Sequence, residues 1–558
     1  MFHQIVGEAG PYSMSTYSKY SPRTAHNSDR VSQLSGSRYV PSPDISIELS
    51  ANPALRHAVS RSPGTSIYNL NDDALLTIFY LSRPSAFEED RFGGIMWGNW
   101  ARERWWYKLV QVCRRWRGLI FDSVSHLGLC LVCTPGTPVA DMLAHSPPLP
   151  LIIDYEHYFL TTEDEEGIAL ALQHRDRVRR INLRTSVPKL QKFITALNDE
   201  FPMLEYLYIT PPAKHDTLLV LPTTFEAPHL NLLILNHFVS PIGSPLLTTA
   251  VGLLTLALRW IHPSTYPHPN QLLEQISLLP QLEALEIGFC SPVPNREIER
   301  QLLHGQITTH VTLPNLLWFS FWGISAYFEA LLPHVTTPLV KDFKVHFFSQ
   351  LSFSVPRLLQ FMMTAENLRF ISVRFLFYYE AVAVYVARDG AEVEDFFMQV
   401  FSYHLDWQVS SVAQIFHVLS PLFSTVAELD LDYRTHTLSS EGHEEADRKW
   451  WRQFLASFRN VKTLRVHNGL VGEVSRALRS EGEPPLELLP ELKELVCPAS
   501  SVEDKTFVAF VHEREDAGQP VNLVGKAYPV GFGSFFFISS TGGYNVDPDP
   551  DPDPDSPQ

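Results

Sequence analysis

The sequence predicts an α/β protein in which short strands alternate with helices and stack into one repetitive parallel sheet. From Val178 onward, three apolar residues spaced by three and then two positions recur about every 23 to 35 residues. Amphipathic segments lie between these groups, and residues 188–201 are an example, with Leu190, Phe193 and Leu197 on one helical face. One strand and one helix per repeat are typical of a solenoid, whose strands form a curved parallel sheet with the helices on its outer face.

The apolar groups predict a leucine-rich-repeat solenoid of irregular construction. Their first members are Val178, Leu204, Leu230, Leu253, Leu282, Leu316, Val340, Leu368, Val426, Val461 and Leu492. The wide spacing between Leu368 and Val426 indicates a degenerate unit or an insertion. Regular repeats place asparagine three residues after the last apolar position. Here Pro212, Phe238 and Cys290 occupy that position, so the backbone groups of these turns must find other hydrogen-bond partners.

Composition limits the classes of partner. The 558-residue chain carries 44 basic and 61 acidic side chains, a formal net charge of −17, which counts against nucleic acid and anionic membranes as partners. No apolar run reaches the roughly 20 residues that span a bilayer, and the first residues lack a secretory pattern. Five scattered cysteines are typical of reduced, buried thiols. We therefore expect a protein of the cytoplasm, the nucleus or both.

Changes in composition divide the chain. Residues rich in Ser, Tyr, Arg and Pro at the start, and repeated Asp-Pro pairs at the end, predict disordered ends. We expect a disordered arm over 1–64, a small helical domain over 65–123, a region leading into the repeats over 124–175, the repeats over 176–500, a capping segment over 501–540 and a disordered acidic tail over 541–558.

Two amphipathic segments make up the predicted helical domain. The first, residues 69–82, has Asn71 as a candidate N-cap, followed by two aspartates that the helix dipole favours. The second, "LVQVCRRWRGLIF" at 109–121, places apolar residues on one helical face and three arginines on the other. Arginines near Trp105 and Trp106 leave open a nucleic-acid or membrane-surface helix, against an ordinary amphipathic helix with solvated arginines.

"NLNDDALLTIF" followed by "WYKLVQVCRRWRGLIF" resembles the F-box, especially in the F-box proteins abundant in mushroom-forming fungi. The resemblance implies that this domain binds the Skp-type adaptor of a cullin ubiquitin ligase and that the repeats hold an unknown protein substrate. The implied adaptor-binding residues are Leu70, Leu75, Ile78, Phe79, Leu109, Val112, Cys113 and Trp116. The sequence departs from the family at Asn71, where proline is usual, and in a longer loop over 83–107. Trp116 is either the anchor of the interface or a core residue only.

Residues that alternate with the apolar groups are expected on the concave face of the sheet. The candidate substrate-binding residues there are Tyr206, Tyr208, Glu286, Trp318, Phe370, Glu428, Asp430 and Arg465. Large aromatic side chains exposed on a strand face suit a protein-binding surface. Any one of these residues can equally be an ordinary exposed strand residue.

Motifs for catalysis and for metal binding are missing from the sequence. Cys130 and Cys133 form a lone C-x-x-C with apolar neighbours, which predicts a buried strand rather than a zinc site. The sequence has no H-E-x-x-H, G-x-S-x-G or phosphate-binding glycine motif. We therefore expect a substrate receptor that is not an enzyme and needs no metal or cofactor. The alternative is an F-box-containing interaction scaffold without a role in degradation.

Overall fold

The structure is a computed structural model that describes only part of the chain. It covers residues 67–83, 100–156, 159–212, 217–291, 305–364, 370–387, 396–434, 447–467, 469–479, 488–499, 502 and 505–526. Contacts divide the chain into two compact units, Met1–Asn69 and Leu70–Gln558. In the first unit the described residues form a single 3₁₀ turn, η2 (Ile67–Asn69). The expected disordered arm over 1–64 and acidic tail over 541–558 lie outside the described residues.

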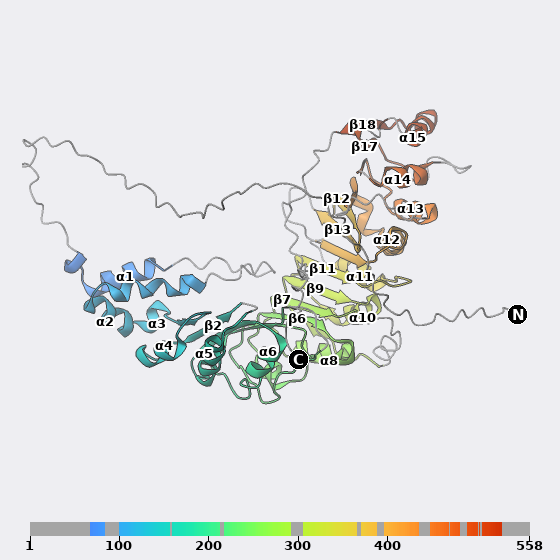
Figure 1. Ribbon diagram of the computed structural model, residues 1–558. Coiled ribbons are helices and arrows are strands. Elements are labelled where there is room, and N and C mark those ends of the chain that lie inside the picture. The colour runs from blue at the N-terminus through green and yellow to red at the C-terminus, as the bar shows by residue number, and fades with distance from the viewer. Residues whose placement is uncertain are drawn as a thin grey trace, which may run out of the picture. The chain divides into compact units, whose positions relative to one another are not determined.

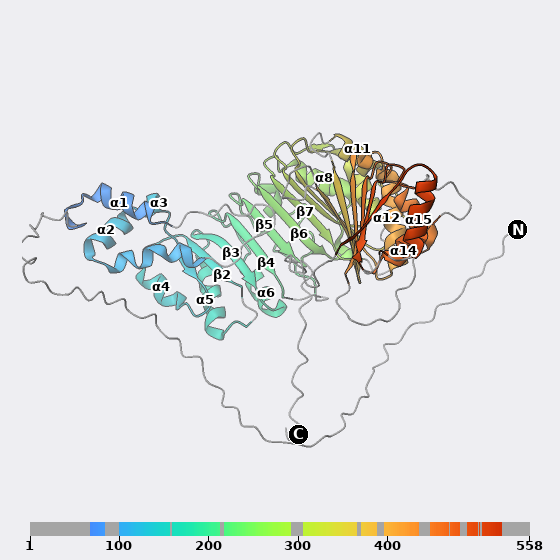
Figure 2. The ribbon, with the colours of Figure 1, turned by 90° about the horizontal axis from the view of Figure 1, so that it is seen from above.

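The second unit is built on one sixteen-stranded sheet with helices along one face (Figures 1 and 2). The strands are β1 (Leu131–Cys133), β2 (Leu151–Tyr155), β3 (Val178–Arg184), β4 (Tyr206–Thr210), β5 (Leu232–Asn236), β6 (Thr255–Ile261), β7 (Ala284–Phe289), β8 (Val311–Thr312), β9 (Trp318–Gly323), β10 (Val335–Thr336), β11 (Asp342–Phe347), β12 (Ser372–Tyr378), β13 (Ala381–Ala387), β14 (Phe396–Phe401), β15 (Glu428–Arg434), β16 (Thr463–Val466), β17 (Glu494–Pro498) and β18 (Asn522–Lys526). Strands β8 and β10 form a separate two-stranded sheet.

Helices and 3₁₀ turns connect the strands. They are α1 (Asp72–Leu81), η3 (Trp100–Tyr107), η4 (Leu109–Gln111), α2 (Arg114–Asp122), α3 (Val124–Leu127), α4 (Val139–His145), α5 (Thr162–Gln173), α6 (Val187–Ile194), α7 (Pro245–Thr249), η5 (Pro263–Thr265), α8 (Pro269–Ser277), α10 (Ser325–Leu331), η6 (Leu332–His334), α11 (Pro356–Thr364), α12 (Leu405–Leu419), η7 (Leu422–Thr425), α13 (Arg448–Leu455), α14 (Val471–Leu478) and α15 (Lys505–Asp516). No helix among the described residues is long and apolar enough to cross a membrane.

The apolar groups found in the sequence line the face of the sheet that the helices cover. Leu207 pairs in register with Leu233, and Ile209 with Leu235, and all four side chains lie in the main core. The members of every other apolar group also lie in the main core, and only the group that begins at Leu368 departs from this pattern. The predicted α/β class is therefore confirmed, with a sheet that is mostly parallel. The sheet also extends past the expected repeat region at both ends, since β1, β2 and β18 belong to it.

The wide spacing after Leu368 contains an insertion. Strands β12, β13 and β14 form an antiparallel meander in an otherwise parallel sheet, with β14 beside β11 and β12 beside β15. The apolar group of β12 is Phe370, Val373 and Phe375, two residues later than the sequence analysis placed it. Phe370 was expected on the concave face, and this prediction is wrong: its side chain is fully buried in the main core. Ile371, expected in the core, is 37% exposed.

Backbone hydrogen bonds satisfy the turns that lack the expected asparagine. His237 directly follows β5, and Trp260 is the next-to-last residue of β6. Each has a φ of 60°, in the left-handed region that is uncommon for residues other than glycine. The His237 amide donates to the Arg259 carbonyl at 2.9 Å, and the Cys290 amide donates to the Ile261 carbonyl at 2.8 Å. Neighbouring strands thus supply the acceptors directly.

Candidate functional site

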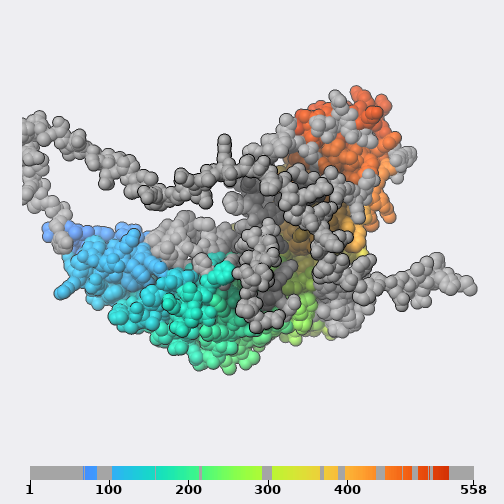
Figure 3. Space-filling model, viewed as in Figure 1, coloured from blue at the N-terminus to red at the C-terminus, as the bar shows by residue number. Residues whose placement is uncertain are grey.

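The residues implied to bind an adaptor lie in a small helical cluster, here called the helical segment, formed by residues 70–83 and 100–127. Its core contains Leu75 and Phe79 of α1, Trp106 of η3 and Ile120 of α2, each at most 4% exposed. Trp116 packs edge-on against Phe79, with ring centroids 4.8 Å apart. The segment therefore has its own apolar centre, which continues into the main core of the sheet. Its surface is continuous with that of the residues that follow it in the chain, coloured teal in Figure 3.

The predicted single helix over 109–121 is interrupted. A 3₁₀ turn, η4, ends before Val112, and Cys113 is extended, with φ −159° and ψ 168°. Helix α2 begins only at Arg114. Val112 is 56% exposed, whereas Leu109 and Trp116 still pack against the same core although the break separates them. The expectation of one continuous helix with a single apolar face is therefore wrong.

The arginines of this region hold the segment together. The Arg115 guanidinium donates to the Asp72 carboxylate at 2.6 and 3.1 Å and to the Leu70 carbonyl at 2.6 Å, which joins α2 to the start of α1. Arg117 donates to the Val110 carbonyl at 3.0 Å. Two of the three arginines are thus hydrogen-bonded within the helical segment. This weakens the hypothesis that the helix binds nucleic acid or lies on a membrane surface.

The implied adaptor-binding residues differ in exposure. Leu75 and Phe79 are buried in the segment's own core, so neither side chain is available to a partner. Half-buried members are Leu70, Leu109, Cys113 and Trp116. Ile78 and Val112 are 40% and 56% exposed. Leu81, 74% exposed and one helical turn after Ile78, is not among the predicted residues, although the i, i+3 spacing identifies it.

The N-cap predicted at Asn71 is present. Its Oδ1 accepts the Ala74 amide at 2.9 Å, and Asp72 and Asp73 occupy the first turn. We expect Asn71→Ala to lower the stability of the helical segment by about 1 kcal/mol, because an unpaired amide is left at the helix start. Urea unfolding followed by tryptophan fluorescence measures this change. Asn71→Asp, which keeps the acceptor, should be nearly neutral, and equal loss in both variants would contradict the capping role.

The helical segment also covers the free edge of β1. Arg104 donates to the Val132 carbonyl at 3.0 Å and to the Thr134 hydroxyl at 2.6 Å, and the Tyr107 hydroxyl accepts the Val132 amide at 3.4 Å. Cys130 and Cys133 lie buried at this strand, as the lone C-x-x-C predicts. An edge closed in this way is not available for pairing with another strand.

The candidate substrate residues lie on the sheet face opposite the helices, here called the second face, apart from Phe370. They are less exposed than expected. Tyr208, Glu286, Trp318 and Asp430 are at most 9% exposed. Tyr206, Glu428 and Arg465 are half-buried. The expectation of large aromatic side chains standing free on this face is therefore wrong for Tyr208 and Trp318.

A row of aromatic rings crosses the second face near the carboxyl ends of the strands. Trp260 lies edge-on to Trp322 at 5.5 Å, and Trp322 stacks on His346 at 3.8 Å between ring centroids. The His346 ring lies 5.1 Å from the Phe397 ring, and its Nδ1 donates a hydrogen bond to Gln399 Oε1 at 3.0 Å. Burial lowers the pKa of His346 to about 3, so this imidazole stays neutral. Trp322 lies two alternations beyond the predicted Trp318, and the other rings lie on strands for which no substrate-binding residue was predicted.

Paired charges occupy the C-terminal part of the second face. Asp430 lies 3.1 Å from Arg374 and 2.7 Å from His467. Burial alone would raise the pKa of Asp430, but His467 and Arg374 together hold it below its usual value. Arg465 pairs with Glu428 at 2.6 Å. Glu286 pairs with Arg259 at 2.6 Å as well, so four of the predicted substrate residues are engaged in ion pairs within the sheet.

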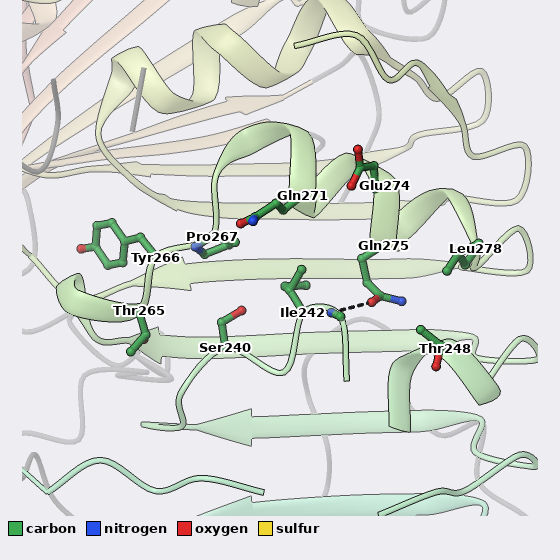
Figure 4. A pocket seen from close by; sticks show the side chains of 11 residues that line it. Ser240, Ile242, Thr248, Thr265, Tyr266, Pro267, Gln271, Glu274, Gln275 and Leu278 are labelled. Atoms are coloured by element: carbon green, nitrogen blue, oxygen red, sulfur yellow. Dashed lines mark hydrogen bonds between the residues drawn. The ribbon is translucent and has the colours of Figure 1, made fainter. Parts of the chain in front are cut away.

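A pocket of about 460 Å³ opens between α7, α8 and the loops that follow β5 and β6 (Figure 4). Its floor includes Gln275, which is 3% exposed and accepts the Gly243 amide at 2.8 Å. Tyr266, Pro267 and Leu278 supply apolar walls. None of the predicted site residues lines this pocket.

Two comparisons with known proteins found no match: no protein-family model matches the chain, and no curated protein matches its sequence. In the part of the chain that the structure describes, no group of three or more His, Cys, Asp or Glu side chains is arranged to hold a metal ion. Evidence for a function therefore comes from the geometry of the helical segment and of the sheet.

Proposed function

We propose that the protein is the substrate-recognition subunit of a Skp–cullin–F-box type ubiquitin ligase, with residues 65–123 acting as the F-box. In this proposal the helical segment binds the Skp-type adaptor, which links it to the cullin. The sheet with its helices, interpreted as an irregular leucine-rich-repeat solenoid, binds the target protein. The proposed role is not catalytic. The protein would act by holding a target near the ubiquitin-loaded enzyme, which raises the effective concentration of the target there.

The exposed apolar edge of α1 is the observation that carries the proposal. Ile78 and Leu81 lie one helical turn apart and are 40% and 74% exposed, while Leu75 and Phe79 anchor the helix from its buried side. Apolar side chains spaced in this way are the anchors of helix-in-groove recognition. The edge lies within the sequence that resembles the F-box, and it has a folded core beneath it.

Repetition in the sheet supports the second half of the proposal. Parallel strands with helices on one face, each repeat contacting its neighbours, are the construction of proteins that present long binding surfaces. Strand addition at the β1 edge is blocked, so binding at this end of the sheet would depend on side chains.

Co-purification of the Skp-type adaptor with the tagged full chain tests the proposal. We expect Ile78→Glu combined with Leu81→Glu to reduce adaptor recovery at least tenfold, because two charges would enter an apolar groove. A matched control is Val251→Glu with Leu254→Glu, two exposed aliphatic residues at the same spacing, 58% and 37% exposed. The control should keep the recovery of the unmodified chain. Undiminished recovery with the first pair would refute the proposed interface.

A further inference from the structure

The turn after β12, the loop after β14 and the first turn of α12 carry an exposed group of aromatic side chains, here called the aromatic patch: Tyr379, Tyr403, His404 and Trp407. Tyr379, Tyr403 and Trp407 are 66%, 64% and 52% exposed. The rings of Tyr379 and Tyr403 lie 5.9 Å apart, and those of His404 and Trp407 lie 5.5 Å apart. Large exposed rings grouped in this way are characteristic of recognition surfaces.

The backbone beneath the patch is fixed. Gln408 is 1% exposed, and its amide donates to the Tyr378 carbonyl at 2.8 Å and to the Ser402 carbonyl at 2.7 Å. The Ser402 amide donates in turn to the Glu380 carbonyl at 2.9 Å. These bonds join the turn that carries Tyr379 to the loop that carries Tyr403. A surface held in place before binding loses little entropy when a partner arrives.

Carboxylates neighbour the rings in the sequence. Glu380 is exposed and follows Tyr379 directly. Asp406 is half-buried and precedes Trp407, and its Oδ1 accepts the Asp447 amide at 2.8 Å. Described cations at the start of the neighbouring α13 already have contacts: Lys449 lies over the Trp450 ring at 5.5 Å, and Arg448 donates to the Arg479 carbonyl. Aromatic faces beside carboxylates attract cations, and the guanidinium of arginine both stacks on rings and pairs with carboxylates.

We propose that the aromatic patch binds an arginine-bearing segment of a partner protein, with guanidinium groups stacked on Trp407 and the tyrosines and paired with Glu380 and Asp406. The net charge of −17 favours the approach of such a basic segment. The proposal names a class of client for the receptor and so rests on the proposed function. Its binding test nevertheless needs neither adaptor nor ligase.

Fluorescence anisotropy with the full chain tests the patch. The probes are a fluorescein-labelled arginine–glycine peptide and the same peptide with citrulline at every arginine, which keeps the shape and removes the charge. We expect the arginine peptide to bind at least tenfold more tightly than the citrulline peptide. Trp407→Ala and Tyr403→Ala should each weaken arginine-peptide binding at least fivefold, whereas Phe159→Ala, at a residue 93% exposed, should leave it unchanged.

Equal affinity for the two peptides, or full affinity in both patch variants, would overturn the proposal. Glu380→Gln supplies a second readout, because removing one carboxylate should flatten the salt dependence of binding without touching a ring. Adaptor recovery in the Ile78 and Leu81 variant is independent of this assay. Failure of the patch and failure of the receptor function are therefore distinguishable.

Discussion

Replacing Trp451 by alanine should destabilise the C-terminal part of the sheet by about 3–5 kcal/mol, the usual cost of removing a fully buried tryptophan. Trp451 lies on α13 and is 0% exposed. Its ring packs 5.7 Å from Phe377 of β12 and 6.0 Å from Phe454. Truncation would leave a large cavity between helix and sheet that close-packed neighbours cannot fill. The midpoint of urea unfolding, followed by circular dichroism, measures the loss.

The adjacent Trp450 provides a matched control. It is only half-buried, so Trp450→Ala should cost clearly less than Trp451→Ala, about 1–2 kcal/mol. Equal losses in the two variants would show that α13 does not bury Trp451 against the sheet. The same result would undermine the packing of the antiparallel meander, because Phe377 belongs to β12.

Replacing Asp154 by asparagine should remove a pH dependence of stability. Asp154 lies on β2, is 7% exposed and accepts the Asn182 amide at 2.6 Å. Burial raises its pKa from 3.8 to about 7, against the opposing effect of the Asn182 bond. A carboxyl whose pKa is higher in the folded than in the unfolded protein contributes fully to the stability at pH values below its pKa in the unfolded chain. That contribution to the stability is lost as the pH rises through its pKa in the folded protein. Stability should therefore fall between about pH 4 and pH 7.

Above pH 7 the buried carboxylate costs up to about 4 kcal/mol, from three pKa units at 1.36 kcal/mol each. Asp154→Asn keeps an oxygen that can accept the Asn182 amide, so the variant should be about 2–4 kcal/mol more stable at pH 8 and lose the decline between pH 4 and 7. Asp122→Asn, at an exposed position, removes the same charge and should change stability by less than about 0.5 kcal/mol. Unfolding midpoints across pH measure both. An unchanged slope in the Asp154 variant would contradict the burial of this carboxylate.

The repeated apolar groups predicted the sheet well because each group must face the same core. Leu285 and Phe319 illustrate this: they lie in different repeats, pair in register and are both buried. The group at Leu368 failed for a physical reason. In "LRFISVRF" two apolar patterns overlap, and the meander selects the one that begins at Phe370, whose ring stacks against Phe423.

Sequence periodicity could not reveal backbone breaks or exposure. Nothing in "LVQVCRRWR" marks Cys113 as extended, because the apolar spacing is compatible with an unbroken helix. The aromatic patch depends on where the β13–β14 insertion places Tyr379 and Tyr403, which are distant in sequence and adjacent in the fold. Leu81 was within reach of sequence reasoning, since it follows Ile78 at helical spacing.

Hydrogen–deuterium exchange of the full chain, with and without a purified Skp-type adaptor, tests the central proposal most directly. The proposal predicts slower exchange on adaptor binding in α1 and across η4 and α2, with Ile78→Glu and Leu81→Glu abolishing the protection. Strands β5 to β11 should exchange at the same rate in both states. Unchanged exchange in α1 at saturating adaptor, or protection confined to the sheet, would contradict the assignment of the helical segment as the adaptor-binding element.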